Sequence, residues 1–231
     1  MKVSRREFMG AAAVGLATAH TVGAATPTAA RKRGPTVPLF NGKNLDGWYS
    51  YLRPIGKNTD PDGIFKVENG IIHVLGKDFG YLATNEEFDD FHLAVEFKWG
   101  EKKFPPRLNA KRDSGILYRF PADKEDKVWP YSIECQVQEG DCGDFWMIGG
   151  TSVVVDGVTH LRFIQKKRDA EKPNGQWNRI EIVADGDRCT HLVNGVVVNE
   201  VAGANVAKGR IVLQSEGAEV FYRKVEVRRL V

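Results

Sequence analysis

Three large polar side chains alternate with apolar ones in the segment YSIECQVQ, residues 131–138. The polar residues are Glu134, Gln136 and Gln138. An alternation with a period of two predicts a β-strand with one face against a core. A carboxylate can transfer a proton, and neighbouring amides suit paired hydrogen bonds to a polar ligand. The pattern predicts the floor of a polar binding groove, and a plain solvated sheet face is the alternative.

Most of the chain that surrounds this segment reads as short strands separated by turns. The segment FDDFHLAVEFKW (88–99) alternates apolar and polar residues, and Asn-Gly or Asp-Gly pairs at 69–70, 156–157, 185–186 and 194–195 predict hairpins. Turn signals every 8 to 12 residues or so are typical of an antiparallel all-β sandwich or barrel. In a two-sheet sandwich with a curved outer face, the outward residues of a central strand line a groove.

The N-terminus predicts export. The segment SRREFMG (4–10) carries twin arginines and is followed by a short, Ala-rich apolar run. These features predict a twin-arginine signal peptide over residues 1–25 and a periplasmic or extracellular location, with a membrane-anchored start as the alternative. Residues 26–36 are expected to be a disordered lead-in, and residues 37–231 a single β-sandwich domain.

Charge and cysteine content narrow the classes of partner. The formal net charge is +3, of which the leader carries +2, so the exported part is nearly neutral. We therefore expect no nucleic acid partner and no membrane partner after signal removal, and we interpret the basic loop at 101–113 as a solvated excursion. A disulfide between Cys142 and Cys189 is possible, with Cys135 in the core. No spacing indicates a zinc site.

Seven segments, taken together and in order, form a specific set. They are LFNGKNLDGW (39–48), FKVENGIIHV (65–74), GYLATNEEFDDFHLAVEFKW (80–99), SGILYR (114–119), IECQVQEGD (133–141), GQWNRIEIVADGDRCTHLVNG (175–195) and GRIVLQSEGAEVFYRKVEV (209–227). The chain resembles the 3-keto-disaccharide hydrolase family over nearly all of residues 37–231. The resemblance implies a concanavalin A-like, two-sheet antiparallel jelly roll. It also implies a small carbohydrate substrate oxidised at the sugar C3, with a sugar oxidoreductase acting upstream.

One departure from the family bears on substrate preference. Where many relatives have E-x-Q-x-D, this chain reads ECQVQE from Glu134 to Glu139 and then inserts GDCGDFWMIGG. The resemblance implies removal of the acidic C2 proton, departure of the C1 glycosidic oxygen and addition of water. This chemistry needs a base near C2, a donor or cation at the C3 oxygen and a proton for the leaving group.

Three residues are candidates for these catalytic roles. Glu134 is the expected base, with a structural carboxylate as the alternative. Arg119 is expected to hold the keto oxygen or to pair with Glu134. His160 could act as acid or base, as histidine side chains often do near neutral pH, although a surface histidine is the plainer interpretation.

The substrate itself is expected to contact a second group of residues. Gln136 and Gln138 are expected to hold sugar hydroxyls, and Trp146 to stack on a sugar face or to pack within its loop. Asp144 lies in the same loop and is also typical of a turn. No organic cofactor is expected and no spacing demands a metal, although a metal held through His160 stays open.

Two other functions also fit the sequence. Glu134 and Glu139 have the spacing of the outer carboxylates in jelly-roll glucanases, so a conventional retaining glycosidase is one alternative. Gln136 takes the place of the middle carboxylate, and an offset of five residues puts the outer pair on opposite faces of a strand unless a bulge intervenes. A non-catalytic carbohydrate-binding module is the other alternative.

Overall fold

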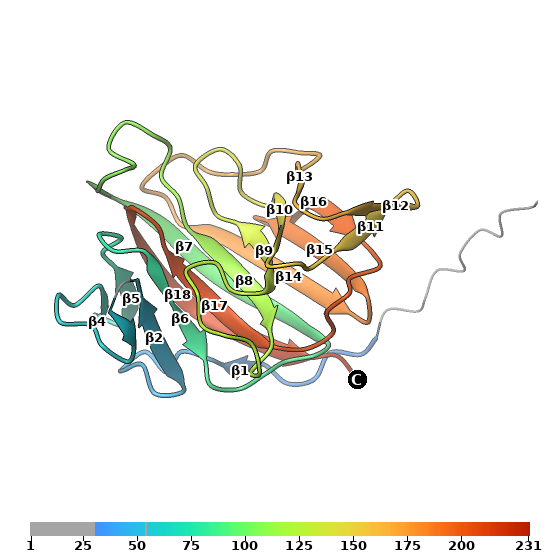
Figure 1. Cartoon of the computed structure of the whole chain (residues 1–231), viewed down its shortest axis with the longest axis horizontal. Helices are drawn as coiled ribbons and strands as arrows, with labels where there is room; N and C mark the ends of the chain where they lie inside the picture. The colour runs from blue at the N-terminus through green and yellow to red at the C-terminus, as the bar shows by residue number, and fades with distance from the viewer. Residues whose placement is uncertain (1–30, 54) are drawn as a thin grey trace, which may run out of the picture. The chain divides into compact units, whose positions relative to one another are not determined.

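The computed structural model describes residues 31–53 and 55–231. The predicted signal peptide and the first part of the lead-in lie outside these residues. The described chain is all-β, and its strands form two large antiparallel sheets. Figure 1 shows the two sheets stacked face to face, with β8, β17 and β6 in front of β7, β18 and β14. This is the jelly-roll sandwich that the sequence predicts.

The back sheet has the order β16-β15-β14-β7-β18-β5-β4, and β1 pairs with β18. Its strands are β1 (Val37–Pro38), β4 (Phe65–Glu68), β5 (Ile71–Val74), β7 (Phe91–Lys103), β14 (Asn178–Asp185), β15 (Arg188–Val193), β16 (Val196–Val201) and β18 (Ala218–Arg229). The front sheet has the order β13-β10-β9-β8-β17-β6-β2-β3. Its strands are β2 (Trp48–Leu52), β3 (Gly56–Lys57), β6 (Gly80–Thr84), β8 (Gly115–Phe120), β9 (Ser132–Gln136), β10 (Phe145–Ile148), β13 (Phe163–Ile164) and β17 (Arg210–Ser215). A small third sheet pairs β11 (Val153–Val155) with β12 (Val158–His160).

Period-two alternation sets the core. The apolar residues of β7, from Phe91 to Trp99 in steps of two, are all buried between the sheets. On β9, Ile133 and Cys135 enter the same core. The intervening residues of β9 therefore lie on the outer face of the front sheet, where the ladder of polar residues was predicted.

The predicted hairpins form at all four Asn-Gly and Asp-Gly pairs. Asn69, Asp156 and Asn194 have positive φ and precede glycines that also have positive φ, as a type I′ turn requires. The fourth pair, at 185–186, joins β14 to β15. These turns fix the register of the hairpins β4–β5, β11–β12, β14–β15 and β15–β16.

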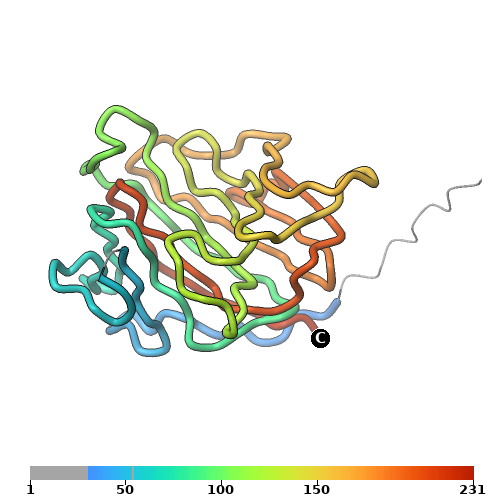
Figure 2. The backbone as a smooth tube through the Cα atoms, in the orientation of Figure 1, coloured from blue at the N-terminus to red at the C-terminus, as the bar shows by residue number. Residues whose placement is uncertain are grey.

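The start of the described chain is ordered against the C-terminal strand. Gly34 donates a backbone hydrogen bond to Arg229 (2.8 Å), and Arg33 forms an isolated bridge with Leu230. In Figure 2 the blue start of the described chain runs beside the red C-terminal segment. The prediction of a disordered lead-in is therefore wrong for residues 31–36, because these residues find backbone partners far away in the sequence.

Cys135, Cys142 and Cys189 are all free thiols in the buried interior, so the possible Cys142–Cys189 disulfide is not formed. Within the described residues, no helix has the length and apolar character needed to cross a membrane.

Candidate functional site

A cavity of about 400 Å³ opens on the outer face of the front sheet, over β9 and β10. This volume falls in the usual range for small-molecule sites. Polar residues supply much of the lining: Arg107, Asp113, Glu134, Gln136, Gln138, Arg162 and Glu216. The other lining residues are Trp129, Trp146, Met147, Ile148 and Gly149. The predicted polar ladder is therefore the floor of a cavity, and not a solvated sheet face.

Glu134 lies at the centre of this floor. It pairs with Leu117 on β8 and with Trp146 on β10. A Cβ on Gly115 would stand 1.9 Å from Glu134 Oε1, so only glycine leaves room for the carboxyl group in this position. No described protein group donates a hydrogen bond to the Glu134 carboxyl. Its proton chemistry is therefore set mainly by burial and by neighbouring charges.

Gln214, on β17, is buried beside this carboxyl group. The same hypothetical Cβ on Gly115 would stand 2.8 Å from Gln214 Oε1, so the two oxygens approach one point. Gln214 is 1% exposed, and neither atom of its amide has a partner among the described residues. An amide oxygen without a partner beside a carboxyl group can accept a hydrogen bond from that group when the group is protonated. This geometry suits a protonated Glu134.

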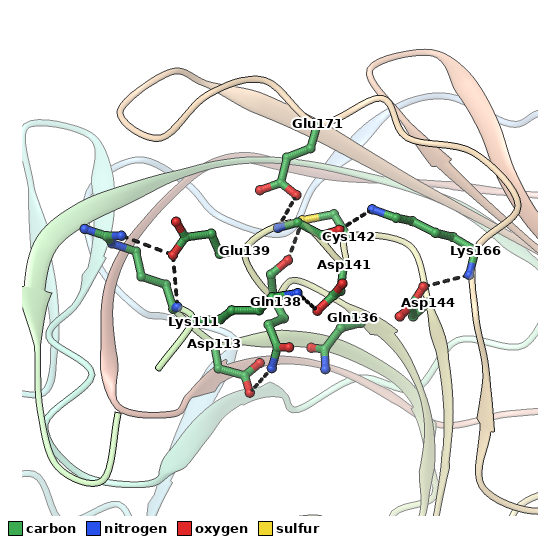
Figure 3. A network of polar contacts seen from close by, with 12 residues as sticks. Lys111, Asp113, Gln136, Gln138, Glu139, Asp141, Cys142, Asp144, Lys166 and Glu171 are labelled. Carbon is green, nitrogen blue, oxygen red and sulfur yellow. Dashed lines mark hydrogen bonds and ion pairs between the residues drawn. The ribbon is translucent and has the colours of Figure 1, made fainter. Parts of the chain in front are cut away.

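A second group of charges joins the floor from outside the ladder. Arg107 Nη2 contacts Asp113 Oδ2 and lies 2.7 Å from Glu216 Oε1. Gln138, just beyond the end of β9, donates from Nε2 to Asp113 Oδ2 (2.7 Å), and Figure 3 shows this bond with Gln136 beside it. The cavity therefore holds three carboxyl groups and the Arg107 guanidinium.

Burial and mutual repulsion raise the pKa values of the three carboxyl groups. Burial raises the pKa of Glu134 well above its usual value, and Glu216 and Asp113 add to this effect. Burial and the charge of Glu216 raise the pKa of Asp113 to about 7, against the opposing effects of Arg107 and Gln138. Burial raises the pKa of Glu216 against Arg107 and a hydrogen bond from the Trp129 side chain. Burial therefore favours the protonated form of Glu134, while Asp113, with a pKa of about 7, is poised to exchange a proton near neutral pH.

Two tryptophans flank the carboxyl groups. Trp146 comes from the inserted segment, which forms β10, and it lies tilted against Phe163 with ring centroids 4.8 Å apart. Its indole nitrogen is buried and has no partner among the described residues. Trp129 comes from the loop between β8 and β9. The cavity thus offers aromatic surface next to groups that transfer protons.

The expectation that Arg119 shares the cavity wall is wrong. The pairs Arg210–Phe120 and Val212–Leu117 place one extra residue on β8, and Arg119 has a φ of 56°. This β-bulge reverses the alternation and turns Arg119 away from the outer face.

The Arg119 side chain is fully buried at the end of the sandwich. Its guanidinium donates to the carbonyl oxygens of Val206 (3.0 Å), Gly186 (2.6 Å) and Asp89 (3.3 Å), and it lies 3.7 Å from Asp90 Oδ1. Arg119 therefore has a structural role and does not contact Glu134.

His160 and Asp144 also lie outside the lining of the cavity. His160 is on β12, opposite Val153 in the small third sheet. Asp144 accepts a hydrogen bond from the Lys166 backbone at Oδ1 (2.7 Å), and burial raises its pKa. Figure 3 shows this bond, which fixes the chain at the start of β10. The structure thus places Glu134, Gln136, Gln138 and Trp146 in the cavity, but not Arg119, His160 or Asp144.

Glu139 does not form a catalytic pair with Glu134. Its carboxylate accepts from Arg112 Nη1 (3.1 Å) and from Asn174 Nδ2 (2.6 Å), and it does not line the cavity. The strand β9 ends at Gln136, so the spacing between the two glutamates no longer reflects strand geometry. The Glu134–Glu139 glycosidase pair is therefore not assembled.

Arg107, Asp113, Glu216 and Trp129 are site residues that the sequence interpretation missed. Arg107 lies within the basic loop that was expected to be solvated. A usable signal existed for Glu216, because Val212, Gln214 and Glu216 continue one face of β17 with a period of two. No local pattern marks Arg107 or Trp129, since loops bring both of them to the cavity.

Among residues 31–53 and 55–231, no group of three or more His, Cys, Asp or Glu side chains is arranged to hold a metal ion. The possible site through His160 therefore has no supporting set of ligands in the described structure.

Solved structures confirm the fold. Two provisionally named glycosyl hydrolases from Parabacteroides distasonis ATCC 8503 superpose with TM-scores of 0.60 and 0.59, at 17% and 22% identity. Both alignments cover 85% of this chain, with 94% and 100% of the other chains. The kappa-carrageenase of Pseudoalteromonas carrageenovora has a TM-score of 0.51 at 11% identity, over 90% of this chain and 100% of that one. No curated protein has a significant sequence match.

The family model gives the more specific result. It is described as a 3-keto-alpha-glucoside-1,2-lyase-like domain and matches residues 35–228. The match covers the sandwich except for the last residue of β18, and it includes every residue that lines the cavity. The chain is accordingly a glycoside-acting enzyme by family, and it belongs to the 3-keto-alpha-glucoside-1,2-lyase-like domain family.

Proposed function

We propose that this protein cleaves 3-keto-glycosides by elimination between C1 and C2 of the oxidised sugar, followed by addition of water. One observation carries the proposal. Glu134, whose protonated form is favoured by burial, shares one small cavity with Asp113, whose pKa is about 7, and with the Arg107 guanidinium. Elimination needs an acid, a base and an electrophilic donor in one place, and this cavity supplies all three.

In the first step Asp113 removes the C2 proton, whose acidity comes from the neighbouring C3 ketone. The electron pair of the C2–H bond forms an enediolate, and the negative charge develops on the C3 oxygen. Arg107 is the group that we assign to this oxygen. It contacts both Asp113 and Glu216, so it lies next to the base. A positioned base typically contributes about 10²–10⁴-fold in rate.

In the second step the enediolate re-forms the ketone, a C1–C2 double bond appears and the C1–O bond breaks. Glu134 gives its proton to the departing oxygen, so the products are an unsaturated 3-keto sugar and a free alcohol. Water then adds across the double bond, with its oxygen at C1 and its hydrogen at C2. The sequence suggested Glu134 as the base, whereas its burial suits the acid.

Gln136, Gln138 and Trp146 are assigned to binding of the sugar ring. Gln138 also holds Asp113 through its amide, so it links binding to the base. Trp146 presents its ring beside Glu134, where a sugar face can stack on it.

A cavity that serves only binding would gain little from these carboxyl groups. Each buried carboxyl group costs desolvation energy, and Arg107, which pairs with Asp113 and Glu216, does not neutralise all three of them. This arrangement is typical of sites that transfer protons. We therefore favour an enzyme over the carbohydrate-binding module.

The experiment compares a 3-keto-α-glucoside with the same glucoside before oxidation. We expect release of the alcohol from the oxidised substrate alone. In D₂O the sugar product should carry deuterium at C2, which direct hydrolysis at C1 cannot introduce. Release from both substrates would support a conventional glycosidase, and binding without release would support a binding module.

Variants test the assigned roles. Asp113→Asn and Glu134→Gln should each lower turnover by at least about 10²-fold while the protein stays folded. Undiminished turnover in either variant would remove that residue from the mechanism.

Export and supply of substrate complete the proposal. The twin arginines at Arg5 and Arg6 support transport of the folded protein out of the cytoplasm. A reporter protein fused behind residues 1–36 should be exported, and replacement of both arginines by lysine should abolish its export. The substrate itself requires an enzyme that oxidises the sugar at C3, so we propose that a sugar oxidoreductase acts upstream.

A further inference from the structure

The loop formed by residues 121–131, between β8 and β9, is fixed against the front sheet. Asp126 Oδ1 accepts hydrogen bonds from Tyr49 (2.7 Å) and Tyr81 (2.6 Å), and Lys57 pairs with its other oxygen (3.5 Å). Tyr81 is fully buried although it lies on the outer face of the sheet. Figure 2 shows this yellow-green loop in front of the strands. The loop therefore covers the outer face on one side of the cavity.

Trp129 lies near the end of this loop, at the edge of the cavity. It is 46% exposed, which is high for the largest apolar side chain, and it meets Phe79 edge to face at 6.3 Å. Trp129 lines the cavity together with Glu216, and its side chain lowers the pKa of that carboxyl group. The indole is thus held beside the carboxyl cluster while much of its surface stays open to a ligand.

The loop end and the end of β10 form one continuous wall. A Cβ on Gly149, whose φ is +70°, would stand 2.9 Å from Tyr131 Cα, so the two segments are in close contact. Ile148 lines the cavity on the same side. The acidic residues and Arg107 belong to the floor, and Arg162 is the charged residue that accompanies β10 in the lining.

We propose that this wall, centred on Trp129 with Ile148 and Gly149, is the subsite for the leaving group and selects a flat, apolar aglycone. The inference rests on the proposed function. The keto sugar occupies the polar floor, where the acid, base and guanidinium lie. The group attached at C1 then extends along the wall of Trp129.

The composition of the wall favours an aromatic group over a second sugar. A second sugar would bring several hydroxyl groups, and each of them loses free energy if it is buried without a partner. Trp129 and Ile148 offer few partners, whereas an indole face stacks well on another ring. The aglycone of this substrate class is therefore of the phenyl or fused-ring type.

The test uses three substrates. Two of them, the 2-phenylethyl and the ethyl 3-keto-α-glucosides, both release a simple alkoxide, and only the first leaving group contains a ring. The third substrate is a 3-keto-disaccharide. For Trp129→Ala we expect kcat/KM for the phenylethyl substrate to fall by about tenfold, mainly through KM. The value for the ethyl substrate should change by less than about twofold.

Trp129→Phe is the conservative variant and should keep most of the preference, because a ring remains at this position. Trp177→Ala is the matched control, since Trp177 lies against Arg223 on the back sheet and does not line the cavity. This control should leave all three substrates unchanged.

Several results would overturn the inference. One such result is an equal loss of kcat/KM on all three substrates after Trp129→Ala. Another is a preference of the wild type for the disaccharide. Either result would show that Trp129 does not form an aromatic subsite. If Trp129→Ala does not fold, product inhibition of the wild type and of Trp129→Phe tests the same inference. In both proteins 2-phenylethanol should inhibit more strongly than ethanol, and equal inhibition by the two alcohols would overturn the inference. Failure of the wild type to cleave any 3-keto substrate would instead refute the proposed function itself.

Discussion

Gly115→Ala tests the geometry of the candidate site most directly. The new methyl group would stand 1.9 Å from Glu134 Oε1, 2.8 Å from Glu134 Cδ and 2.8 Å from Gln214 Oε1. Non-bonded contacts of a Cβ below 3.0 Å are essentially never seen, so the carboxyl oxygen must move by about 1 Å. A misplacement of this size costs on the order of 10²-fold in rate when it involves a group that acts on the reacting atoms.

The variant should remain folded, because Gly115 does not have the positive φ that would exclude alanine. Overpacking at one site typically costs about 1–3 kcal/mol, which a domain of this size can absorb. We therefore expect a loss of kcat on the 3-keto-glucoside together with a small fall in the melting temperature. Steady-state kinetics and thermal unfolding of the same preparation measure both quantities.

Gly100→Ala provides the matched control. Its methyl group would stand 2.3 Å from Glu219 Oε2, so the crowding of a carboxylate is similar. Glu219 bonds to His73 on the back sheet (2.9 Å), away from the cavity. Gly100→Ala should lower stability and spare turnover. A Gly115→Ala enzyme with a kcat within about threefold of the wild type would refute the assignment of Glu134 to the reacting atoms.

Three further predictions follow from the charges. Because the pKa of Asp113 is about 7, kcat/KM should fall as the pH drops below this value and the base takes up a proton, and Asp113→Asn should remove that acidic limb from the residual rate. Folding raises the pKa values of Glu134 and Asp113, so their protonated forms stabilise the folded protein fully at a pH below their pKa values in the unfolded chain. This stabilisation is lost as the pH rises through their pKa values in the folded protein. The melting temperature should therefore fall from about pH 5 to about pH 8, and it should fall less steeply in Glu134→Gln. Arg119→Met should lower the free energy of unfolding by about 3–5 kcal/mol, or the melting temperature by roughly 10 °C, because the hydrogen bonds to three carbonyl groups are lost. The kcat of the folded variant should stay unchanged. A loss of kcat without a loss of stability would instead support a role for Arg119 in the reaction.

The role of Glu134 shows how burial changes a prediction. Sequence pattern placed this carboxyl group on the outer face of a strand, and that placement is correct. An outward carboxylate on an open sheet face would be ionised and would suit a base. Here the loops that carry Arg107, Asp113 and Trp129 close over the face, and the resulting burial favours the protonated form.

Local sequence patterns were sufficient to predict the strands, their inner and outer faces and the hairpins. These features depend on local rules: side chains alternate every two residues along a strand, and Asn-Gly pairs accept positive φ. The same rules placed Glu134 and Gln136 on one face, and the set of family segments predicted the jelly roll.

The other residues that meet at that face depend on contacts between distant parts of the chain. The bulge that turns Arg119 inward depends on the pairing of β8 with β17, and no pattern within SGILYR indicates it. Asp113 and Glu216 are about a hundred positions apart in the chain, and Arg107 joins them because the front sheet places β8 beside β17. The pKa values follow from that assembly, since the free energy of a charge depends on all the groups that surround it, and folding brings those groups together.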